Sequence, residues 1–317
     1  MVKLAPEARE ASFTACQIAP LDSMPAYGVG LMYNPALADF VRSDLDTFDY
    51  LEITPDMFWT DQGRGQQPRF VELDSTLELL EWVHDRRPIM AHNISLSIGS
   101  AELFDHEYIA QIAEWHRRYH FPWHSDHLSM VQYIDESGQV CDAGLAVPFP
   151  YDYELLDQLA GRIAYVQQTI TAPFLLENNV YYIQFPEQDM TETAFLNQLT
   201  ERTSCGLLLD VHNLYANALN HRYDPIADYI DHLDLDRVVE IHIAGGNEFA
   251  GMYTDSHSGP CPESVWELLE IVTPRTPNLR GITFEFHDSY YPLLKSKGIR
   301  DELEHAQRIW IEHRQRI

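Results

Sequence analysis

Residues 206–211 have the sequence GLLLDV, and residues 238–245 have the sequence VVEIHIAG. Both runs are almost continuously apolar and lack the alternation of polar and apolar residues that a half-exposed strand shows. A parallel strand that is covered on both faces requires this pattern. The two runs therefore predict buried parallel strands, and each carries an ionisable residue, Asp210 or His242, near its end.

Similar short runs, rich in β-branched, Leu and Met residues, recur along the whole chain. Segments with apolar residues three and four positions apart, typical of amphipathic helices, lie between them. Eight strands that alternate with eight helices favour a (β/α)8 TIM barrel over an open doubly wound sheet, and no GxGxxG motif follows the first run. The predicted strands cover residues 28–32, 50–55, 88–94, 123–128, 174–179, 206–213, 238–244 and 282–287. The predicted helices cover residues 35–45, 75–86, 106–119, 152–170, 192–203, 225–232, 262–271 and 298–312.

The length and composition predict one folded domain. The chain has 317 residues, of which 45% are hydrophobic and 22% are charged, as in ordinary globular proteins. Residues 1–26 are expected to form an N-terminal extension, and residues 27–317 a single TIM-barrel domain. No apolar run of about 18 residues and no signal peptide is found, so we expect no membrane partner.

The charge and the cysteines narrow the class of protein further. The net charge of −28 comes from 49 acidic against 21 basic residues, which disfavours nucleic acid and anionic membrane surfaces as partners. Cys16, Cys141, Cys205 and Cys261 are scattered without a CxxC spacing, which argues against a zinc ribbon and a disulfide framework. A reducing, cytoplasmic location is expected.

Two polar insertions that contain glycine, residues 63–68 and 135–144, follow the second and fourth predicted strands. Loops that follow strands build the active face of a TIM barrel, so these insertions are candidates for a lid or for substrate contact. A tolerated surface loop is an equally good interpretation.

Ionisable residues cluster where the predicted strands end. A His, Asp or Glu inside an apolar strand is costly unless it is paired or bound to metal, so several in register indicate a metal site. Imidazole and carboxylate ligands together suit Fe, Mn, Co and Zn. The surplus of candidates predicts two or three ions, because carboxylates can bridge two cations. The candidate ligands are His92, Asp126, Glu177, Asp210, Asn213, His242, Asp255, His257 and Glu285.

Two assignments depend on strand parity. Neighbouring residues of a strand face opposite ways, so Asp126 and His127 are not expected to share an ion, and Asp126 is favoured. Parity also places Asp210 and His212 on one face, whereas a turn at the strand end would bring in Asn213 instead; both alternatives stay open. The candidate catalytic residues are Asp210, His212, Asn213 and Glu285.

Seven motifs lie at or near the ends of the predicted strands. In chain order they are HNISLSIG (92–99), SDHL (125–128), LENN (176–179), GLLLDVHN (206–213), NH (220–221), HIAG (242–245) and TDSH (254–257). This ordered set resembles the DUF692 family of multinuclear non-heme iron-dependent oxidative enzymes, relatives of the methanobactin biosynthesis iron enzyme. The resemblance runs from about residue 28 to residue 285.

The resemblance implies a xylose-isomerase-like barrel that holds two or three iron ions and uses O2 as co-substrate. It implies oxidation of a side chain, most often cysteine, in a ribosomally made precursor peptide, and a separate protein that recognises the peptide leader. The family's metal ligands correspond to His92, Asp126, Glu177, Asp210, His242, Asp255 and His257, with Asn213 and Glu285 as further members.

The chain departs from the family pattern at three places. His212 stands where the family commonly has an Asn, and the late acidic motif is Glu285-Phe286-His287. Asp56-Met57 stands where Glu-Asn is expected after the second strand. The extra imidazoles at the mouth bear on metal number and substrate orientation.

Two other functions are compatible with the same barrel. One is a divalent-metal isomerase or phosphoesterase, although a phosphate substrate would need Lys or Arg at the strand ends, which carry none. The other is a metal-binding protein without catalytic activity.

Overall fold

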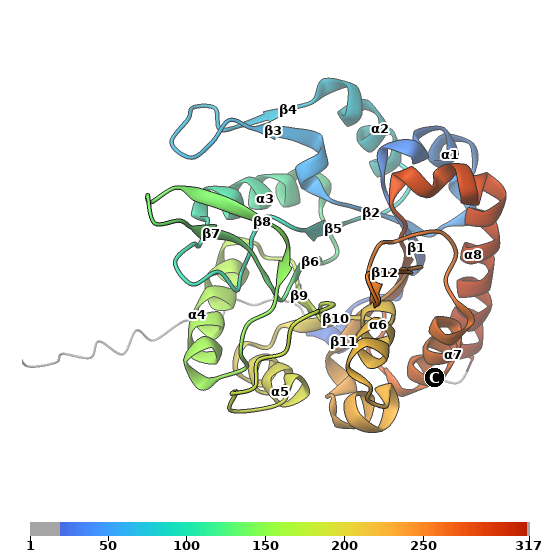
Figure 1. The fold of residues 1–317 in the computed structure, drawn as a ribbon. Coiled ribbons are helices and arrows are strands. Elements are labelled where there is room, and N and C mark those ends of the chain that lie inside the picture. Colours follow the sequence, from blue (N-terminus) through green and yellow to red (C-terminus); the bar gives the residue numbers. More distant parts are fainter. Residues whose placement is uncertain (1–19, 316–317) are drawn as a thin grey trace, which may run out of the picture.

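Eight parallel strands close into a barrel in the computed structural model, which describes residues 20–315 (Figure 1). The predicted (β/α)8 architecture is confirmed, and each of the eight predicted runs overlaps one barrel strand. Strand β1 pairs with β2 on one side and with β14 on the other, which closes the sheet. The barrel strands are β1 (Gly28–Met32), β2 (Tyr50–Ile53), β5 (Ile89–Asn93), β6 (His124–His127), β9 (Phe174–Glu177), β10 (Gly206–Asp210), β11 (Val238–Ile243) and β14 (Gly281–Phe284).

Helices surround the barrel and cover the outer faces of its strands (Figure 1). Their buried Leu, Ile, Val and aromatic side chains pack against the outward residues of the strands in one large core. The α-helices are α1 (Ala38–Ser43), α2 (Asp74–His84), α3 (His106–Tyr119), α4 (Tyr153–Thr169), α5 (Glu192–Thr203), α6 (Val211–His221), α7 (Glu263–Val272) and α8 (Tyr291–Arg314). Short 3-10 turns are η1 (Leu21–Ser23), η2 (Pro35–Leu37), η3 (Leu45–Thr47), η4 (Pro55–Phe58), η7 (Leu235–Arg237), η8 (Thr273–Arg275) and η9 (Asp288–Tyr290).

Two predicted elements differ in the structure. The strand predicted over residues 206–213 ends at Asp210, and helix α6, which was not predicted, begins at the next residue. The Asp210 side chain caps α6 by accepting a hydrogen bond of 2.7 Å from the backbone N–H of Asn213. The helix predicted over residues 225–232 is instead a π-helical turn, η5 (Pro225–Tyr229), followed by a 3-10 turn, η6 (Ile230–His232).

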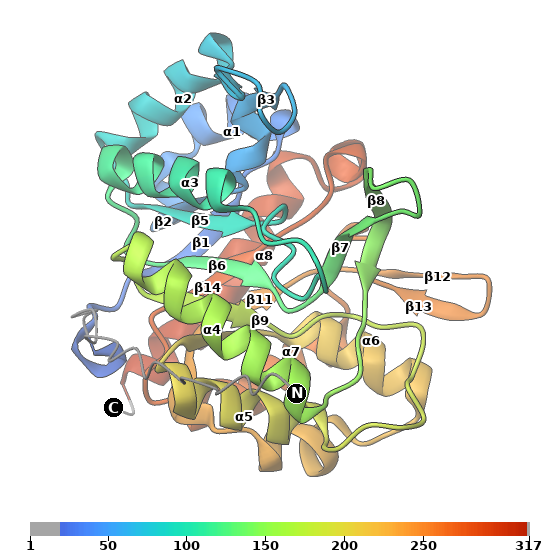
Figure 2. The same cartoon turned by 90° about the vertical axis from the view of Figure 1, so that its left-hand side faces the viewer.

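Three two-stranded hairpins follow barrel strands at their carboxyl ends. They are β3 (Trp59–Asp61) with β4 (Phe70–Glu72), β7 (Met130–Ile134) with β8 (Val140–Val147), and β12 (Asn247–Phe249) with β13 (Met252–Thr254). Figure 2 shows the last two projecting from the same end of the barrel. The predicted insertions at residues 63–68 and 135–144 lie in the first two hairpins, and the third was not predicted.

The amino-terminal end of the barrel is filled by apolar side chains. Tyr50, Met90, Trp123, Leu175, Leu208 and Val239 form a separate buried cluster, and Met24 packs onto it. Arg280 Nη2 donates to the carbonyl oxygens of Leu21 and Asp22, both at 3.1 Å, which ties the segment before β1 to this end. Of the predicted extension, residues 1–19 lie outside the described residues.

Within residues 20–315, every helix is too short or too polar to cross a lipid bilayer. Cys141, Cys205 and Cys261 are free thiols, and Cys16 lies outside the described residues.

Helix α6 offers a matched test of the fold, because one of its leucines is buried and another is exposed. Leu214 is fully buried in the core, whereas Leu219 is 48% exposed. Leu214→Ala should lower the free energy of unfolding by about 2–5 kcal/mol, since it leaves a cavity. Leu219→Ala should change it by less than about 1 kcal/mol. Urea titration followed by tryptophan fluorescence, at equal metal content, measures both; equal losses would contradict the buried face assigned to α6.

Candidate metal centre

Ionisable side chains converge inside the barrel at its carboxyl end. Because side chains alternate along a strand, residues two apart point to the same side. Tyr50 of β2, Leu175 of β9 and Leu208 of β10 belong to the apolar cluster inside the barrel. The residues two positions later, Glu52, Glu177 and Asp210, therefore face the same interior, one layer closer to the mouth. All three of these acids are buried.

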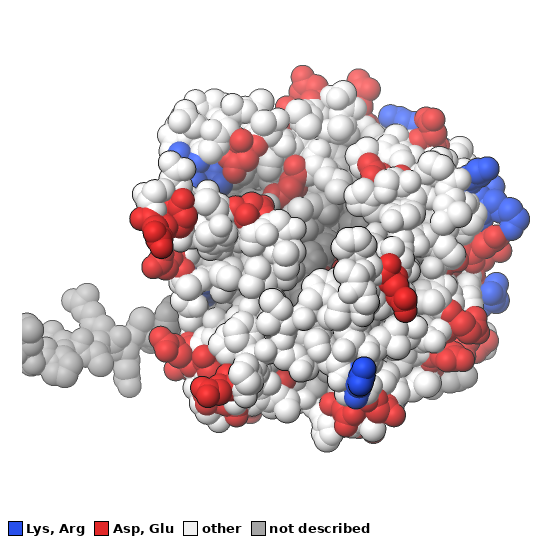
Figure 3. All heavy atoms as spheres, in the orientation of Figure 1, with Lys and Arg blue, Asp and Glu red and all other residues white. Residues whose placement is uncertain are grey.

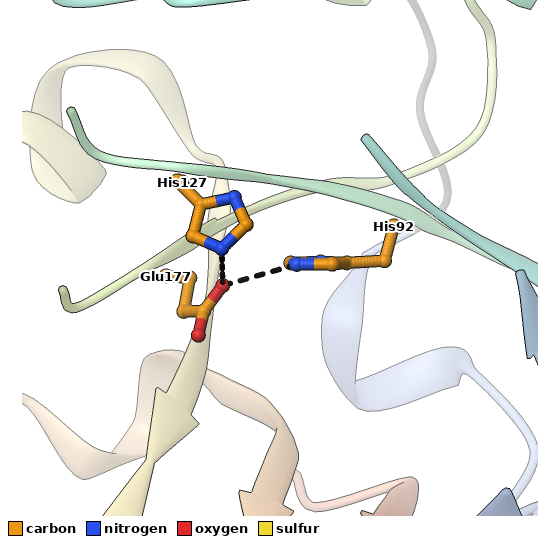
Figure 4. A group of neighbouring side chains, drawn as sticks. All are labelled: His92, His127 and Glu177. Atoms are coloured by element: carbon orange, nitrogen blue, oxygen red, sulfur yellow. Dashed lines mark ion pairs between the residues drawn. The ribbon is translucent and has the colours of Figure 1, made fainter. Parts of the chain in front are cut away.

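The first group of potential ligands is His92, His127 and Glu177 (Figure 4). The Nε2 atoms of His92 and His127 lie 3.2 and 3.3 Å from Glu177 Oε2. His92 Nδ1 is 2.8 Å from Ser125 Oγ, a contact that fixes the orientation of the ring. Two imidazole nitrogens and one carboxylate oxygen thus meet at a point that a divalent cation can occupy.

Two more groups share residues with the first and with each other. Glu177, Asp210 and His242 offer ligand atoms within 4.8 Å of one another, and so do Glu52, Glu240 and His242. His242 Nε2 lies 2.9 Å from Glu52 Oε2. Glu177 therefore belongs to two groups, which is the position a bridging carboxylate takes between two metal ions.

A chain of contacts extends from His242 toward the mouth. Glu285 Oε1 lies 3.5 Å from His242 Nδ1 and 3.3 Å from His257 Nε2. His257 Nε2 is 2.9 Å from Asp255 Oδ1, which also lies 3.2 Å from His212 Nδ1. The outer members are partly accessible, with exposed fractions of 29% for His257 and 19% for Asp255. This end of the cluster is therefore accessible from the mouth, which is the opening at the carboxyl end of the barrel.

The backbone is strained at the outer end. His257 adopts a left-handed conformation with φ of 48°, which is uncommon for a residue other than glycine. Such conformations cost about 1–3 kcal/mol and persist where the surrounding structure holds them, often at functional sites. A side chain at Gly246 would come within 2.6 Å of His212 Nε2, so glycine is required for the close approach of that loop to the cluster.

The acids of the cluster interact unfavourably with one another. Burial raises the pKa of Glu177 well above its usual range, and the nearby Asp210 carboxylate raises it further. Burial raises the pKa of Asp210 to about 7, with a contribution from the charge of Glu285. Crowded carboxylates in a buried site favour either a proton or a metal cation between them.

His242 and His257 report the same negative potential, whereas burial lowers the pKa of His92 well below its usual value and also lowers that of His127. Burial alone would lower the pKa of His257, but the carboxylates of Asp255 and Glu285 raise it to about 10. In the same way, Glu52 and Glu285 overcome burial and raise the pKa of His242 well above its usual range. Positive charge is therefore stabilised at the centre, whether a proton or a metal ion carries it.

Unsatisfied polar atoms support the fit of metal ions. A buried polar atom without a hydrogen-bond partner is costly, and metal coordination satisfies it as well as a hydrogen bond does. The buried atoms of the cluster with neither a hydrogen bond nor an ion-pair contact within residues 20–315 are Glu52 Oε1, Asp210 Oδ2, His212 Nε2 and Asn213 Oδ1. These oxygen and imidazole donors fit two or more first-row divalent ions.

The structure brings together eight of the nine predicted ligands. His92, Glu177, Asp210 and His242 belong to the three groups, and Asp255, His257 and Glu285 form the outer chain. Asn213 Nδ2 lies 3.3 Å from Glu177 Oε1, and His212 contacts Asp255, so helix α6 brings both residues to the centre.

Asp126 is placed differently from the other predicted ligands. It is fully buried and belongs to none of the three groups; instead its charge interacts with that of Asp56, whose carboxylate accepts a hydrogen bond of 2.7 Å from Tyr108. Its neighbour His127 faces the cluster. The two residues do face opposite ways, as parity predicts, but the geometry favours His127 as the ligand.

Glu52 and Glu240 are members of the cluster that the sequence analysis did not single out. Each is an acid within an otherwise apolar strand, YLEI or VVEIHI, and this is the same signal that identified Asp210. Both are fully buried. Glu240 lies two residues before His242 on the same strand, so strand parity predicts that both side chains point into the barrel.

Figure 3 shows the barrel mouth as a hollow on a surface where Asp and Glu outnumber Lys and Arg.

The chain is similar in sequence to proteins of one family. A sequence model of that family, described as RiPP precursor modification enzyme MbnB/TglH/ChrH, matches residues 27–310. A UPF0276 protein of Rhizorhabdus wittichii is 32% identical over 295 residues, which cover 93% of this chain and 98% of that protein. A UPF0276 protein of Caulobacter vibrioides is 31% identical over 255 residues, which cover 80% of this chain and 85% of that protein.

The fold resembles that of a xylose isomerase domain containing protein from Salmonella typhimurium. The TM-score is 0.57 at 12% identity, and the match covers 90% of this chain and 97% of that chain. At this identity the likeness shows the fold alone, and it confirms the xylose-isomerase-like barrel.

The two neighbouring residues of β6 give a test of the ligand assignment. His127→Ala should weaken the binding of Fe2+ by more than roughly tenfold, because even partners outside the ligand set cost 10–100-fold. Asp126→Asn should leave the affinity little changed, since Asp126 faces away from the three groups. Anaerobic equilibrium dialysis with metal analysis measures both variants. The reverse result would restore Asp126 as the ligand.

Proposed function

Because the chain belongs to the RiPP precursor modification enzyme family MbnB/TglH/ChrH, we propose that it is an iron-dependent oxidase or oxygenase of a precursor peptide. A member of this family is an enzyme that acts on a ribosomally made precursor peptide. The proposed cofactor is two or three iron ions, the co-substrate is O2, and the modified group is a side chain, in the first place cysteine.

The observation that carries this proposal is the position of Glu177. Glu177 is a member of two candidate ligand groups. One group is completed by His92 and His127, and the other by Asp210 and His242. A carboxylate shared in this way supports a centre with at least two ions. Glu285, which links His242 to His257, extends the donors toward a further ion.

The donor set supports iron among the first-row metals. Imidazoles and carboxylates suit Fe, Mn, Co and Zn, and no cysteine belongs to the three ligand groups. Bound iron would supply the one-electron chemistry that a reaction with O2 needs. The side chains of the three ligand groups would hold the ions, and the partly exposed Asp255 and His257 leave one end of the cluster open to solvent.

Accessibility indicates where the substrate side chain enters. His92, Asp210 and His242 are buried, whereas His257 and Asp255 are partly exposed. A cysteine side chain of the peptide would therefore approach from the Asp255 end. The negative potential that the carboxylates of Asp255 and Glu285 create at His257 favours cations there, and bound cations would in turn stabilise the thiolate form of an approaching cysteine.

The hairpins supply contact area for a peptide and a partner. Leu145 on β8 and Phe249 on β12 are exposed apolar side chains near the mouth. Exposed apolar groups of this kind are typical of surfaces that bind other proteins or peptides. We propose that a separate protein recognises the peptide leader, and that the enzyme acts in the cytoplasm, where its thiols and a peptide cysteine stay reduced.

Metal analysis of protein purified without oxygen tests the proposal. We expect two or more iron ions per chain, with a Mössbauer spectrum that shows coupled sites. His242→Ala and Asp255→Ala should each lower the iron content and abolish O2-dependent mass change of the precursor peptide, because each removes a proposed ligand.

His232→Ala is the matched control, because this histidine is exposed on η6, outside the cluster. It should retain both iron and turnover. Protein that contains zinc or manganese alone, or variants without iron that keep full activity, would refute the proposal and favour the divalent-metal isomerase or phosphoesterase alternative.

A further inference from the structure

A second cavity lies outside the metal centre, between the segment after β8, the segment between β9 and α5, and η5. Its volume is about 500 Å3, within the range of pockets that hold small ligands. We call it the tyrosine pocket; it is defined by Tyr151, Tyr181, Tyr223 and Tyr229 around Glu192. None of these residues belongs to the candidate metal groups.

Glu192 is a buried acid without a cationic partner. It is 8% exposed, and within residues 20–315 it forms no ion pair with Lys, Arg or His. Tyr229 donates a hydrogen bond of 3.2 Å to Glu192 Oε1. Burial raises the pKa of Glu192 to about 7, although hydrogen bonds from Tyr229 and Tyr151 oppose the shift. The acid is therefore held by neutral hydroxyl donors, and no cationic side chain among residues 20–315 balances its charge.

All four tyrosines line the same cavity as Glu192, and Tyr229 makes the hydrogen bond to its carboxylate. Burial is the largest cause of the raised pKa of each tyrosine hydroxyl, and the charge of Glu192 adds to it. Aromatic rings next to a carboxylate form a site that suits ammonium and guanidinium groups, because both the ring and the acid attract positive charge.

Other residues that line the pocket also favour a positively charged ligand. Asp228 is a second acid in the lining, and no Lys or Arg is among the described residues that line it. Ile183, which is 64% exposed, and Phe185 line the same cavity and present apolar surface. Lys and Arg side chains combine an apolar stem with a charged end, and so they match both parts of the pocket.

The pocket is joined to the metal centre through one loop. Glu177 ends β9, and four residues later Tyr181 lines the pocket. The hydroxyl of the next residue, Tyr182, accepts a hydrogen bond of 3.2 Å from the backbone N–H of Asp255. The segment that carries a ligand of the centre therefore also builds the pocket and contacts the outer end of the cluster.

We propose that the tyrosine pocket binds a Lys or Arg side chain of the precursor peptide, with Glu192 as the counter-ion, and so positions the modified residue at the mouth of the barrel. The identity of the ligand as a peptide rests on the proposed function. The excess of acidic residues over basic ones, 49 against 21, favours the approach of a basic segment.

Binding of small amides to the protein as purified without oxygen tests this inference. The probes are the N-acetyl N′-methylamides of arginine, lysine, citrulline and norleucine, which have no free carboxylate to bind the metal centre. Shifts of the tyrosine-pocket resonances in NMR titrations should saturate with the arginine or the lysine probe. The neutral citrulline and norleucine probes should bind at least about tenfold more weakly, a difference of about 1.4 kcal/mol. Equal binding of citrulline or norleucine would overturn the proposal.

Two matched variants identify the counter-ion. Glu192→Gln should remove the preference for arginine over citrulline, whereas Glu187→Gln, an exposed acid of the same loop that does not line the pocket, should retain it. Thermal melting and metal content of both variants are measured in parallel. If Glu192→Gln fails to fold, the comparison of charged and neutral probes on the unaltered protein still decides the matter.

Different results would refute the proposed oxidative function and the proposed binding of a cationic side chain in the tyrosine pocket. Protein without iron that still prefers the arginine probe would refute only the oxidative function. Protein with its iron intact and no preference for a charged probe would refute only the binding of a cationic side chain.

Discussion

The confinement of like charges at the carboxyl end of a closed barrel is the constraint on which the site depends. The barrel has no free edge that could open to separate the acids, because β14 pairs with β1. Glu52, Glu177 and Asp210 are held by their strands at fixed positions, away from water. Negative charge that can neither move nor be solvated favours cations strongly, and the sharing of Glu177 determines how those cations would be arranged.

One layer deeper, Glu240 shows what a satisfied acid looks like in the same barrel. It accepts hydrogen bonds from Tyr50 at 3.0 Å, from Trp123 at 2.6 Å and from Thr283 at 2.8 Å. Three neutral donors therefore meet its two oxygens, whereas Asp210 Oδ2 has no partner and Glu177 Oε2 meets only the imidazoles of His92 and His127. Glu240 supports His242 from below, and this contrast separates an acid that the fold needs from acids that are available for ligands.

Much of the fold and most of the site could be predicted from the sequence. Continuous apolar runs identify buried parallel strands, and an acid or histidine in such a run identifies the cluster. The end of a run is harder to locate: Asp210 both ends β10 and caps α6, so the apolar residues of the first helical turn continue the pattern of the strand. Whether His127 is a ligand depends on where β6 ends, which residue spacing does not show. The cavity around Glu192 is built by segments distant in the sequence, so spacing alone could not predict it either.

The apolar plug at the amino-terminal end of the barrel limits how molecules reach the centre. Among the described residues, Met24 and the side chains beneath it fill that end of the interior, so the proposed substrates would enter and leave through the mouth between the hairpins. The O2 and the peptide of the proposed reaction would share this one opening and would have to pass it in a definite order. A bound peptide would close the way behind any O2 already inside, and a finished peptide would have to leave before the next one could enter. With a single opening, release of the product could limit the rate of the proposed reaction as readily as the chemical step does.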